Sequence, residues 1–146
     1  MKKVILLSVI LLGFIGTQQA QTLDNLFDKY CHNEKFTYVS VGKGMMNTIK
    51  NYADFDEETE DMIPTSVKIL TLEEVSTGNA QLAKQIISEI MSIMNSDNFE
   101  KILEVSEKGE ATYIYSKKYD DKNCDQLLLD ITDEEVSIIW TRGKKK

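Results

Sequence analysis

Histidine, proline and tryptophan each occur once in this chain of 146 residues, and cysteine occurs twice. One histidine and two distant cysteines fall short of the four ligands of a structural zinc site unless carboxylates contribute. The sequence contains no Gly-x-Ser-x-Gly elbow, no His-Glu-x-x-His helix and no Cys-x-x-Cys pair. It therefore supplies no catalytic signature and no cofactor motif, and an enzyme is the class of protein that it supports least.

Positive charge is also scarce. The chain has 17 basic against 24 acidic residues, a formal net charge of −7. Because an acidic body repels the phosphate backbone, nucleic acid is excluded as an expected partner. The length suits one compact domain, and no repeat or low-complexity linker divides it.

Residues 1–20 are typical of a secretory signal peptide. Lys2 and Lys3 precede an apolar run from Val4 to Ile15, and a short polar stretch leads to Ala20. The run is shorter than the roughly 20 residues of a membrane span, so no span is expected in the mature chain. No cysteine follows closely enough to carry a lipid. We expect a periplasmic or secreted domain of residues 21–146, with 15 basic and 24 acidic residues left after cleavage.

Export to an oxidising compartment raises the question of a disulfide between Cys31 and Cys124. Such a bond would close a loop of roughly 90 residues, worth about 4–5 kcal/mol in the chain-entropy model. The alternative is two unpaired thiols, and spacing alone does not decide between them. His32 directly follows Cys31, but adjacent side chains point apart and do not form a nucleophile and its base, so a surface histidine is favoured.

Hydrophobic periodicity predicts the elements and their order. Helices are expected at 22–30, 45–52 and 79–95, and strands at 35–41, 66–72, 124–131 and 136–143, with a hairpin over 99–118 that turns at "EKGE". Helices and strands alternate first, and strands then follow one another. This order predicts an α+β single domain: an antiparallel or mixed sheet of about six strands, about three helices packed on one face, and a C-terminal β-meander.

The stretch "VGKGMMN" raises the question of a phosphate site. A dinucleotide fingerprint requires a third glycine where Asn47 stands, and a P-loop requires a Lys-Ser/Thr pair where Met45 follows the second glycine. Gly42, Lys43 and Gly44 remain a weak anion-site candidate, because a helix N-terminus attracts negative charge. The favoured interpretation is a tight strand-to-helix turn in which the glycines adopt positive φ.

Charged runs offer further candidates. The acidic run consists of Asp54, Asp56, Glu57, Glu58, Glu60 and Asp61. It lacks the central glycine and alternating spacing of a calcium-binding EF-hand loop, so a solvated loop is favoured over a metal site. "DDKNCD" (120–125) is interpreted as a turn between strands, and "RGKKK" (142–146) as a short basic tail.

Several phrases, in this order, resemble one family. They are "LDNLFDKY", "FTYVSVGKGMM", "VKILTL", "FEKILEVSEKGEATYIYSKK" and "IIWTRG". The chain is similar over residues 22–143 to the small exported bacterial proteins of domain of unknown function 4252, found mostly in the Bacteroidetes. The resemblance implies an exported envelope protein without an assigned activity, lipid-anchored in many members. It transfers no catalytic residue, and the lipidation cysteine is missing here.

Two functions are carried forward. The first is a non-enzymatic envelope protein that binds or regulates another envelope protein through an exposed sheet edge or a helix-facing groove. The alternative is a periplasmic carrier of a small apolar ligand, in which Met45, Met46, Ile49 and Trp140 line a pocket; their periodicity favours a place in the core instead. The oligomeric state is left open.

Overall fold

The computed structural model describes residues 22–53, 56, 58, 63–121 and 123–144. Its helices are α2 (Leu23–Tyr30), α3 (Lys43–Ala53) and α5 (Ala80–Ser96), and an irregular helical turn, η1 (Val75–Asn79), precedes α5. Its strands are β1 (Phe36–Val41), β2 (Ser66–Leu72), β3 (Glu100–Glu107), β4 (Glu110–Lys118), β5 (Asn123–Ile131) and β6 (Val136–Lys144). The predicted α+β class and element order are confirmed.

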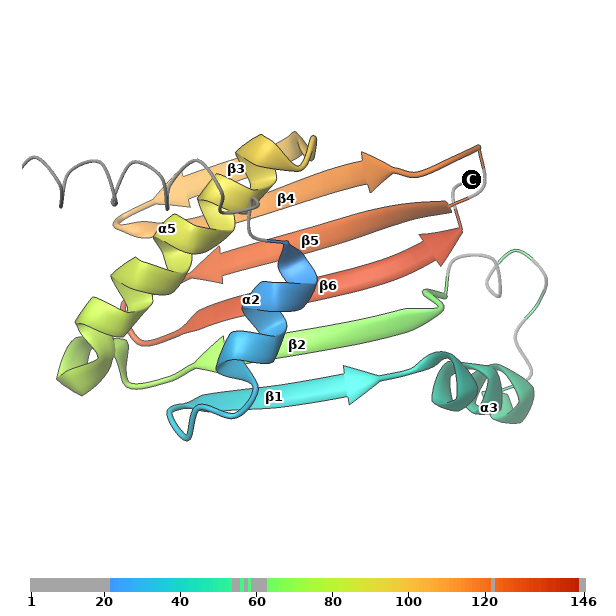
Figure 1. The fold of residues 1–146 in the computed structure, drawn as a ribbon, viewed down its shortest axis with the longest axis horizontal. Helices are drawn as coiled ribbons and strands as arrows, with labels where there is room; N and C mark the ends of the chain where they lie inside the picture. Colours follow the sequence, from blue (N-terminus) through green and yellow to red (C-terminus); the bar gives the residue numbers. More distant parts are fainter. Residues whose placement is uncertain (1–21, 54–55, 57, 59–62, 122, 145–146) are drawn as a thin grey trace, which may run out of the picture.

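The strands form one open sheet in the order β1-β2-β6-β5-β4-β3 (Figure 1). Every neighbouring pair is antiparallel, which decides between the antiparallel and mixed sheets that the sequence left open. Strands β3 to β6 form the expected meander, and β2 then pairs with β6. Strands β2 and β6, which are far apart in the chain, are therefore neighbours in the middle of the sheet.

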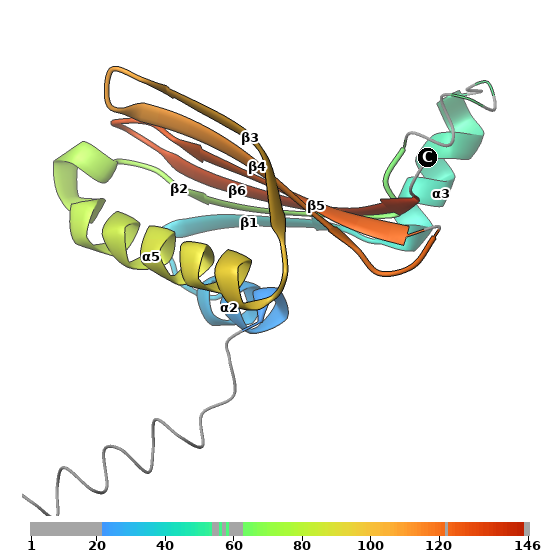
Figure 2. The ribbon, with the colours of Figure 1, turned by 90° about the horizontal axis from the view of Figure 1, so that it is seen from above.

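Helices α2 and α5 cover one face of this sheet (Figures 1 and 2). The hydroxyl of Thr22 caps α2 by accepting a hydrogen bond from the Asn25 N–H at 3.2 Å. In α5, the buried positions recur every three or four residues: Ala83, Ile86, Ile90, Ile93 and Met94. This stripe packs on the strand residues that face it, because helical spacing brings such positions onto one side. We call this side of the sheet the covered face.

The covered face supplies most of the core. Its buried strand residues are Phe36, Leu70, Leu72, Tyr115, Leu127, Leu129, Val136, Ile138 and Trp140. Within each strand they occur at alternate positions, as the period of two of a pleated strand requires. The predicted inward faces of the fifth and sixth strands are confirmed for Leu127, Leu129, Val136, Ile138 and Trp140, whereas Ile131 is only partly buried.

Helix α3 lies apart from the other two helices. It begins one residue after β1 and rises from the end of the sheet on the side away from α2 and α5 (Figure 2). It buries Met46 and exposes Met45, Ile49 and Tyr52. The expectation of about three helices on one face thus holds for two helices, because the one-residue connection after β1 leaves α3 at the end of the sheet rather than over the covered face.

Candidate functional site

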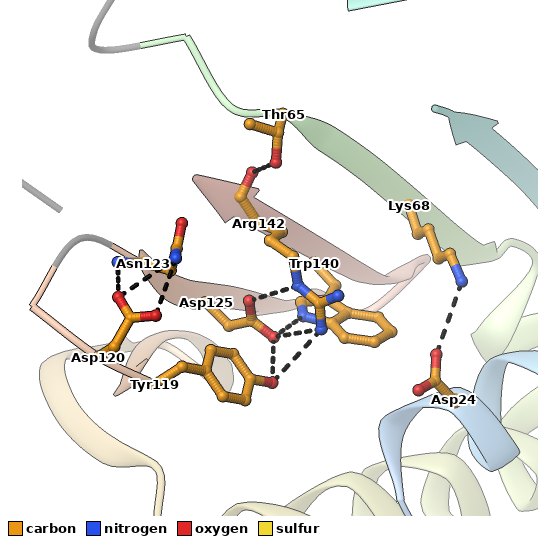
Figure 3. Close-up of polar contacts among 9 residues, drawn as sticks. All are labelled: Asp24, Thr65, Lys68, Tyr119, Asp120, Asn123, Asp125, Trp140 and Arg142. Carbon is orange, nitrogen blue, oxygen red and sulfur yellow. Dashed lines mark hydrogen bonds and ion pairs between the residues drawn. The ribbon is translucent and has the colours of Figure 1, made fainter. Parts of the chain in front are cut away.

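A buried carboxylate lies at one end of the covered face. Asp125 alternates with Leu127 and Leu129 along β5, so it faces the interior, and it is fully buried. Its carboxylate accepts hydrogen bonds from the Tyr119 hydroxyl at 2.8 Å, the Trp140 indole N–H at 2.9 Å and the Arg142 Nε at 3.1 Å (Figure 3). We call these four residues the Asp125 cluster. It joins β5, β6 and the residue that follows β4.

The electrostatics of the Asp125 cluster follow from this geometry. The hydrogen bond from Arg142 to Asp125 raises the pKa of the guanidinium, although partial burial opposes the rise. Burial, together with the hydrogen bond to Asp125, raises the pKa of Tyr119. A buried carboxylate is tolerated only with such partners. With both oxygens engaged by donors, Asp125 is suited to holding three segments together rather than to transferring protons.

A small cavity lies beside the cluster. It has a volume of about 60 Å³ and is lined by Asp24, Ser66, Lys68, Trp140 and Arg142. The Lys68 ammonium is 5.3 Å from the centre of the indole ring, and the Arg142 guanidinium carbon is 5.7 Å from it. Lys68 also pairs with Asp24 at 3.7 Å. The volume is far below the roughly 300 Å³ at which ligand pockets begin, so the space suits water.

A second polar network joins the two covering helices. Glu89 of α5 accepts hydrogen bonds from Lys29 at 2.6 Å and from the Tyr30 hydroxyl at 2.7 Å, and Gln85 donates to that hydroxyl at 3.1 Å. Burial opposes ionisation of Glu89, but the hydrogen bonds from Lys29 and Tyr30 outweigh it and lower the pKa. Helical periodicity assigns Glu89 to the solvent side, whereas the structure places it against α2.

The glycine stretch is the tight strand-to-helix connection that the sequence predicts, because Gly42 alone separates β1 from α3. Helix α3 begins at Lys43, so Gly44 lies inside it and Gly42 directly precedes it. Among the described glycines, positive φ is found at Gly109. The expectation of positive φ at Gly42 and Gly44 is therefore wrong. The weak anion-site candidate of Gly42, Lys43 and Gly44 lies at an exposed helix N-terminus, with open space around both glycines.

The structure records both cysteines as free thiols and does not show the disulfide. Cys31 lies between α2 and β1. The first residue of β1, Phe36, is at the same level of the sheet as Ile131, the last residue of β5. Cys124 lies near the opposite end of β5, roughly 20 Å along the strand. That separation far exceeds the ~7 Å between Cα atoms that a disulfide permits. The Cys31 thiol instead donates to the Asp28 carbonyl, and His32 is exposed.

The charged runs have different outcomes. Asp54, Glu57, Glu60 and Asp61 lie outside the described residues, so the acidic loop stays a prediction. Among the residues that the structure describes, no group of three or more His, Cys, Asp or Glu could hold a metal ion. The strands predicted at 124–131 and 136–143 are confirmed; the overlapping turn interpretation is therefore wrong for Asn123 to Asp125, which begin β5, and the tail interpretation is wrong for Arg142 to Lys144, which end β6.

The four residues named for a carrier pocket do not lie together. Met45 and Ile49 are exposed on α3, and Met46 is buried outside the main core. Trp140 belongs to the core and to the charged cavity described above. The core interpretation is therefore confirmed for Trp140 and, outside the main cluster, for the buried Met46. The cavity beside Trp140 has neither the size nor the apolar lining of a carrier site.

The face of the sheet opposite α2 and α5 presents a different surface, which we call the bare face. Its centre is a row of aliphatic side chains in direct register, one from each strand: Val39, Ile69, Ile139, Leu128, Ile114 and Leu103. We call it the aliphatic row. Val39 and Leu103 at its ends are each 43% exposed. No helix within the described ranges packs over its middle (Figure 2).

Charge is nearly absent around the aliphatic row. One flanking row consists of Thr37, Thr71, Ser137, Asp130, Thr112 and Val105, and the other of Val41, Val67, Thr141, Gln126, Ser116 and Glu100. Asp130 and Glu100 are the two charged residues in these rows, and Asp130 accepts a hydrogen bond from Thr112 at 2.8 Å. Thr71 and Ser137 bond to each other at 3.0 Å. Depletion of charge around an apolar centre is the compositional mark of a protein interface.

Comparison with known proteins identifies the family. The model of the domain of unknown function DUF4252 matches residues 30–145. The chain belongs to the DUF4252 family. This confirms the resemblance seen in the sequence and adds no activity. No curated protein and no solved structure matches the chain. In the part of the chain that the structure describes, no helix is long and apolar enough to cross a membrane.

Reasoning from the sequence missed both the Asp125 cluster and the bare face. The signal for the cluster is the alternation of side chains along each strand. Asp125 lies on the same side of β5 as Leu127, and Arg142 lies on the same side of β6 as Trp140. A carboxylate and a guanidinium on the core-facing sides of two strands indicate a buried ion pair. The signal for the bare face is the second aliphatic set within each strand, such as Ile139 beside Ile138, which exceeds what one buried face requires.

Proposed function

We propose that this protein acts in the cell envelope, without catalysis, by binding another protein through the bare face. The observation that carries the proposal is the aliphatic row, which crosses all six strands with little charge around it. Exposed apolar surface of this extent is uncommon on monomeric proteins and marks an interaction site. The envelope location rests on the signal-peptide pattern of residues 1–20 and on what the family resemblance implies.

The polar groups support binding rather than chemistry. The buried carboxylate of Asp125 has its donors in place, and the Cys31 thiol donates to a backbone carbonyl rather than to a base. A thiol nucleophile requires a base within hydrogen-bonding reach. On the bare face, the hydroxyls of Thr71 and Ser137 bond to each other, and the Thr112 hydroxyl donates to Asp130.

Site-specific photo-crosslinking in the exporting host tests this proposal. A photoreactive phenylalanine at Ile139, in the centre of the bare face, should give one protein adduct of defined mass. The same residue at Ser88, on the exposed side of α5, is the matched control and should give none. Absence of any protein adduct from position 139, with the chain exported and folded, would contradict a protein-binding role for this face.

A further inference from the structure

We infer that the partner of the bare face is a second copy of this chain, with the two sheets packed face to face. This inference rests on the proposed function and names its partner. Two antiparallel sheets pack stably about 10 Å apart when their apolar faces interdigitate. Here each copy would bring the aliphatic row of one sheet against that of the other, and the pair would form a sandwich with helices on both outer sides.

The size of the face suits such a pair. Six strands at about 4.8 Å spacing give a width of roughly 29 Å, and three rows of side chains give a length of roughly 20 Å. Each copy would bury about 500–600 Å², so the pair would bury about 1,000–1,200 Å², at the lower limit of specific interfaces. The exposed apolar stripe of α3, formed by Met45, Ile49 and Tyr52, extends the surface on the same side of the sheet.

Charge selects one of two symmetric arrangements. A two-fold axis along the aliphatic row places each row residue opposite its own copy and reverses the strands end for end. Helix α3, which carries Lys43 and Lys50 and no acidic residue, then faces the far end of β1 and β2 in the second copy. That end is a hollow of about 470 Å³ whose lining includes Glu34, Glu73 and Glu74 against the single cation of Lys35.

The other arrangement brings like charges together. A two-fold axis parallel to the strands would place α3, with its two lysines, over the opposite edge of the sheet, where the exposed Glu100 of β3 and Lys118 of β4 offset each other. It would place the hairpin carboxylates Glu107 and Glu110 over the end of β1 and β2 that carries Glu34, Glu73 and Glu74 beside Lys35. Like charges facing each other across an interface are unfavourable. The axis along the row is therefore the one we assign.

The first experiment measures mass in solution. Analytical ultracentrifugation of the exported, purified protein at about 100 μM, above the micromolar dissociation constants that small interfaces show, should give a dimer. Ile139→Lys should raise the dissociation constant by ~100-fold or more, since it places an unpaired ammonium in the apolar centre. Ser88→Lys adds the same charge on exposed α5 and should leave the dimer intact. Circular dichroism confirms that both variants are folded.

The second experiment tests the axis by charge exchange. Lys43→Glu with Lys50→Glu should weaken the dimer by about 10-fold, and so should Glu34→Lys with Glu73→Lys. All four changes in one chain should restore it, because opposite charges then face each other again. If each double variant weakens the dimer and the four-fold variant does not restore it, the assigned axis is wrong.

The remaining outcomes separate the inference from the function on which it rests. A monomeric wild-type protein, or a dimer that tolerates Ile139→Lys, overturns the inference; the latter would place the contact elsewhere, for example at the free edge of β1. If the protein is monomeric and the photoreactive residue at position 139 captures a protein of another mass, the proposed function stands without the second copy. If position 139 captures nothing, both fail.

Discussion

The two faces of the sheet differ less in sequence than in surroundings. Ile138 and Ile139 are neighbours in β6, and each lies in a line of aliphatic side chains across the sheet. Ile138 is fully buried beneath the helices, whereas Ile139 is only partly covered by its neighbours in the sheet. A strand that is apolar on both sides is expected when both faces are buried. Aliphatic composition alone therefore does not decide burial: the described helices cover one of two similar lines of side chains and leave the other partly exposed.

The same contrast holds for carboxylates. Asp125 and Asp130 both belong to β5 and point to opposite faces. Asp125 is enclosed by Tyr119, Trp140 and Arg142, while Asp130 accepts one hydrogen bond from Thr112. The covered face thus fixes its charge in an internal network. On the bare face, Asp130 lies in one row beside the aliphatic row and Glu100 lies in the other.

The sharpest test compares the two isoleucines. Ile138→Ala should lower the free energy of unfolding by about 3–4 kcal/mol, because it removes fully buried methyl groups and leaves a cavity. Ile139→Ala removes the same atoms from the bare face and should cost the monomer less than about 1 kcal/mol. Urea denaturation at low protein concentration measures both. Equal losses would mean that the bare face is as buried as the covered one and would break the comparison.

The two aspartates provide the next test. Asp125→Asn should lower the free energy of unfolding by about 2–3 kcal/mol, since the amide keeps the shape but loses the charge and places N–H groups against the donors of Trp140 and Arg142. Asp130→Asn should cost at most about 0.5 kcal/mol, because the amide oxygen still accepts from Thr112. Thermal and urea unfolding of both variants would show whether the loss of unfolding free energy is larger on the covered face than on the bare face.

A third prediction concerns the helix layer and its dependence on pH. The folded state lowers the pKa of Glu89 below its ordinary 4.5. Between pH 4.5 and the lower folded pKa, the unfolded chain therefore binds a proton that the folded chain does not. Stability from Glu89 is fully present above this pH and is lost as the pH falls through the folded pKa. Glu89→Gln should lower the free energy of unfolding by about 1 kcal/mol at neutral pH; the effect is small because the Lys29 side chain is about half exposed. The variant should also lose less stability than the wild type as the pH falls below 4.5.

Urea titrations from pH 6 to pH 3 measure this effect. Glu104→Gln is the control: it also removes one carboxylate from an ion pair with a lysine, but at the exposed edge strand β3. A wild-type curve that falls no more steeply below pH 4.5 than the curve of Glu89→Gln would contradict the role given to Glu89 in joining α5 to α2.

The smallest effect concerns glycines at the two ends of the sheet. Gly44 lies inside α3 with open space around it, so Gly44→Ala should raise the free energy of unfolding by about 0.5 kcal/mol. Gly109 has a φ of 84° in the β3–β4 turn, where Lys108 is also left-handed. Gly109→Ala should therefore lower the free energy of unfolding by about 1 kcal/mol. Opposite signs in the same urea assay are expected. A loss of stability on Gly44→Ala would indicate a positive φ at Gly44 and would contradict the helical conformation seen there.

Much of the fold was predictable because it depends on local pattern. The spacing of Ala83, Ile86 and Ile90 predicts α5, and "EKGE" predicts the hairpin whose turn residues have positive φ. The pairing of β2 with β6 could not be predicted, since strand partners distant in the chain leave no local mark. The position of α3 was missed for a related reason: amphipathic spacing shows that a helix has an apolar side but not where that side packs.

The candidate sites follow the same division. The alternation that places Asp125 on the side of Leu127 was visible in the sequence, and Arg142 lay in a predicted strand. Their pairing with each other and with Tyr119 depends on the register of β5 against β6, which the sequence does not show. The cysteines were left open for the same reason, because their distance depends on the sheet as a whole. The aliphatic row exists only once six strands are aligned in register.

The sequence by itself determined the family, the α+β class, the elements and the alternation of side chains within each strand, because these depend on residues a few positions apart. Only the tertiary structure decided which face the helices cover, that Asp125 lies between Trp140 and Arg142, and that six separate aliphatic residues form one row. The physical reason is that register and layer packing depend on contacts between residues far apart in the chain.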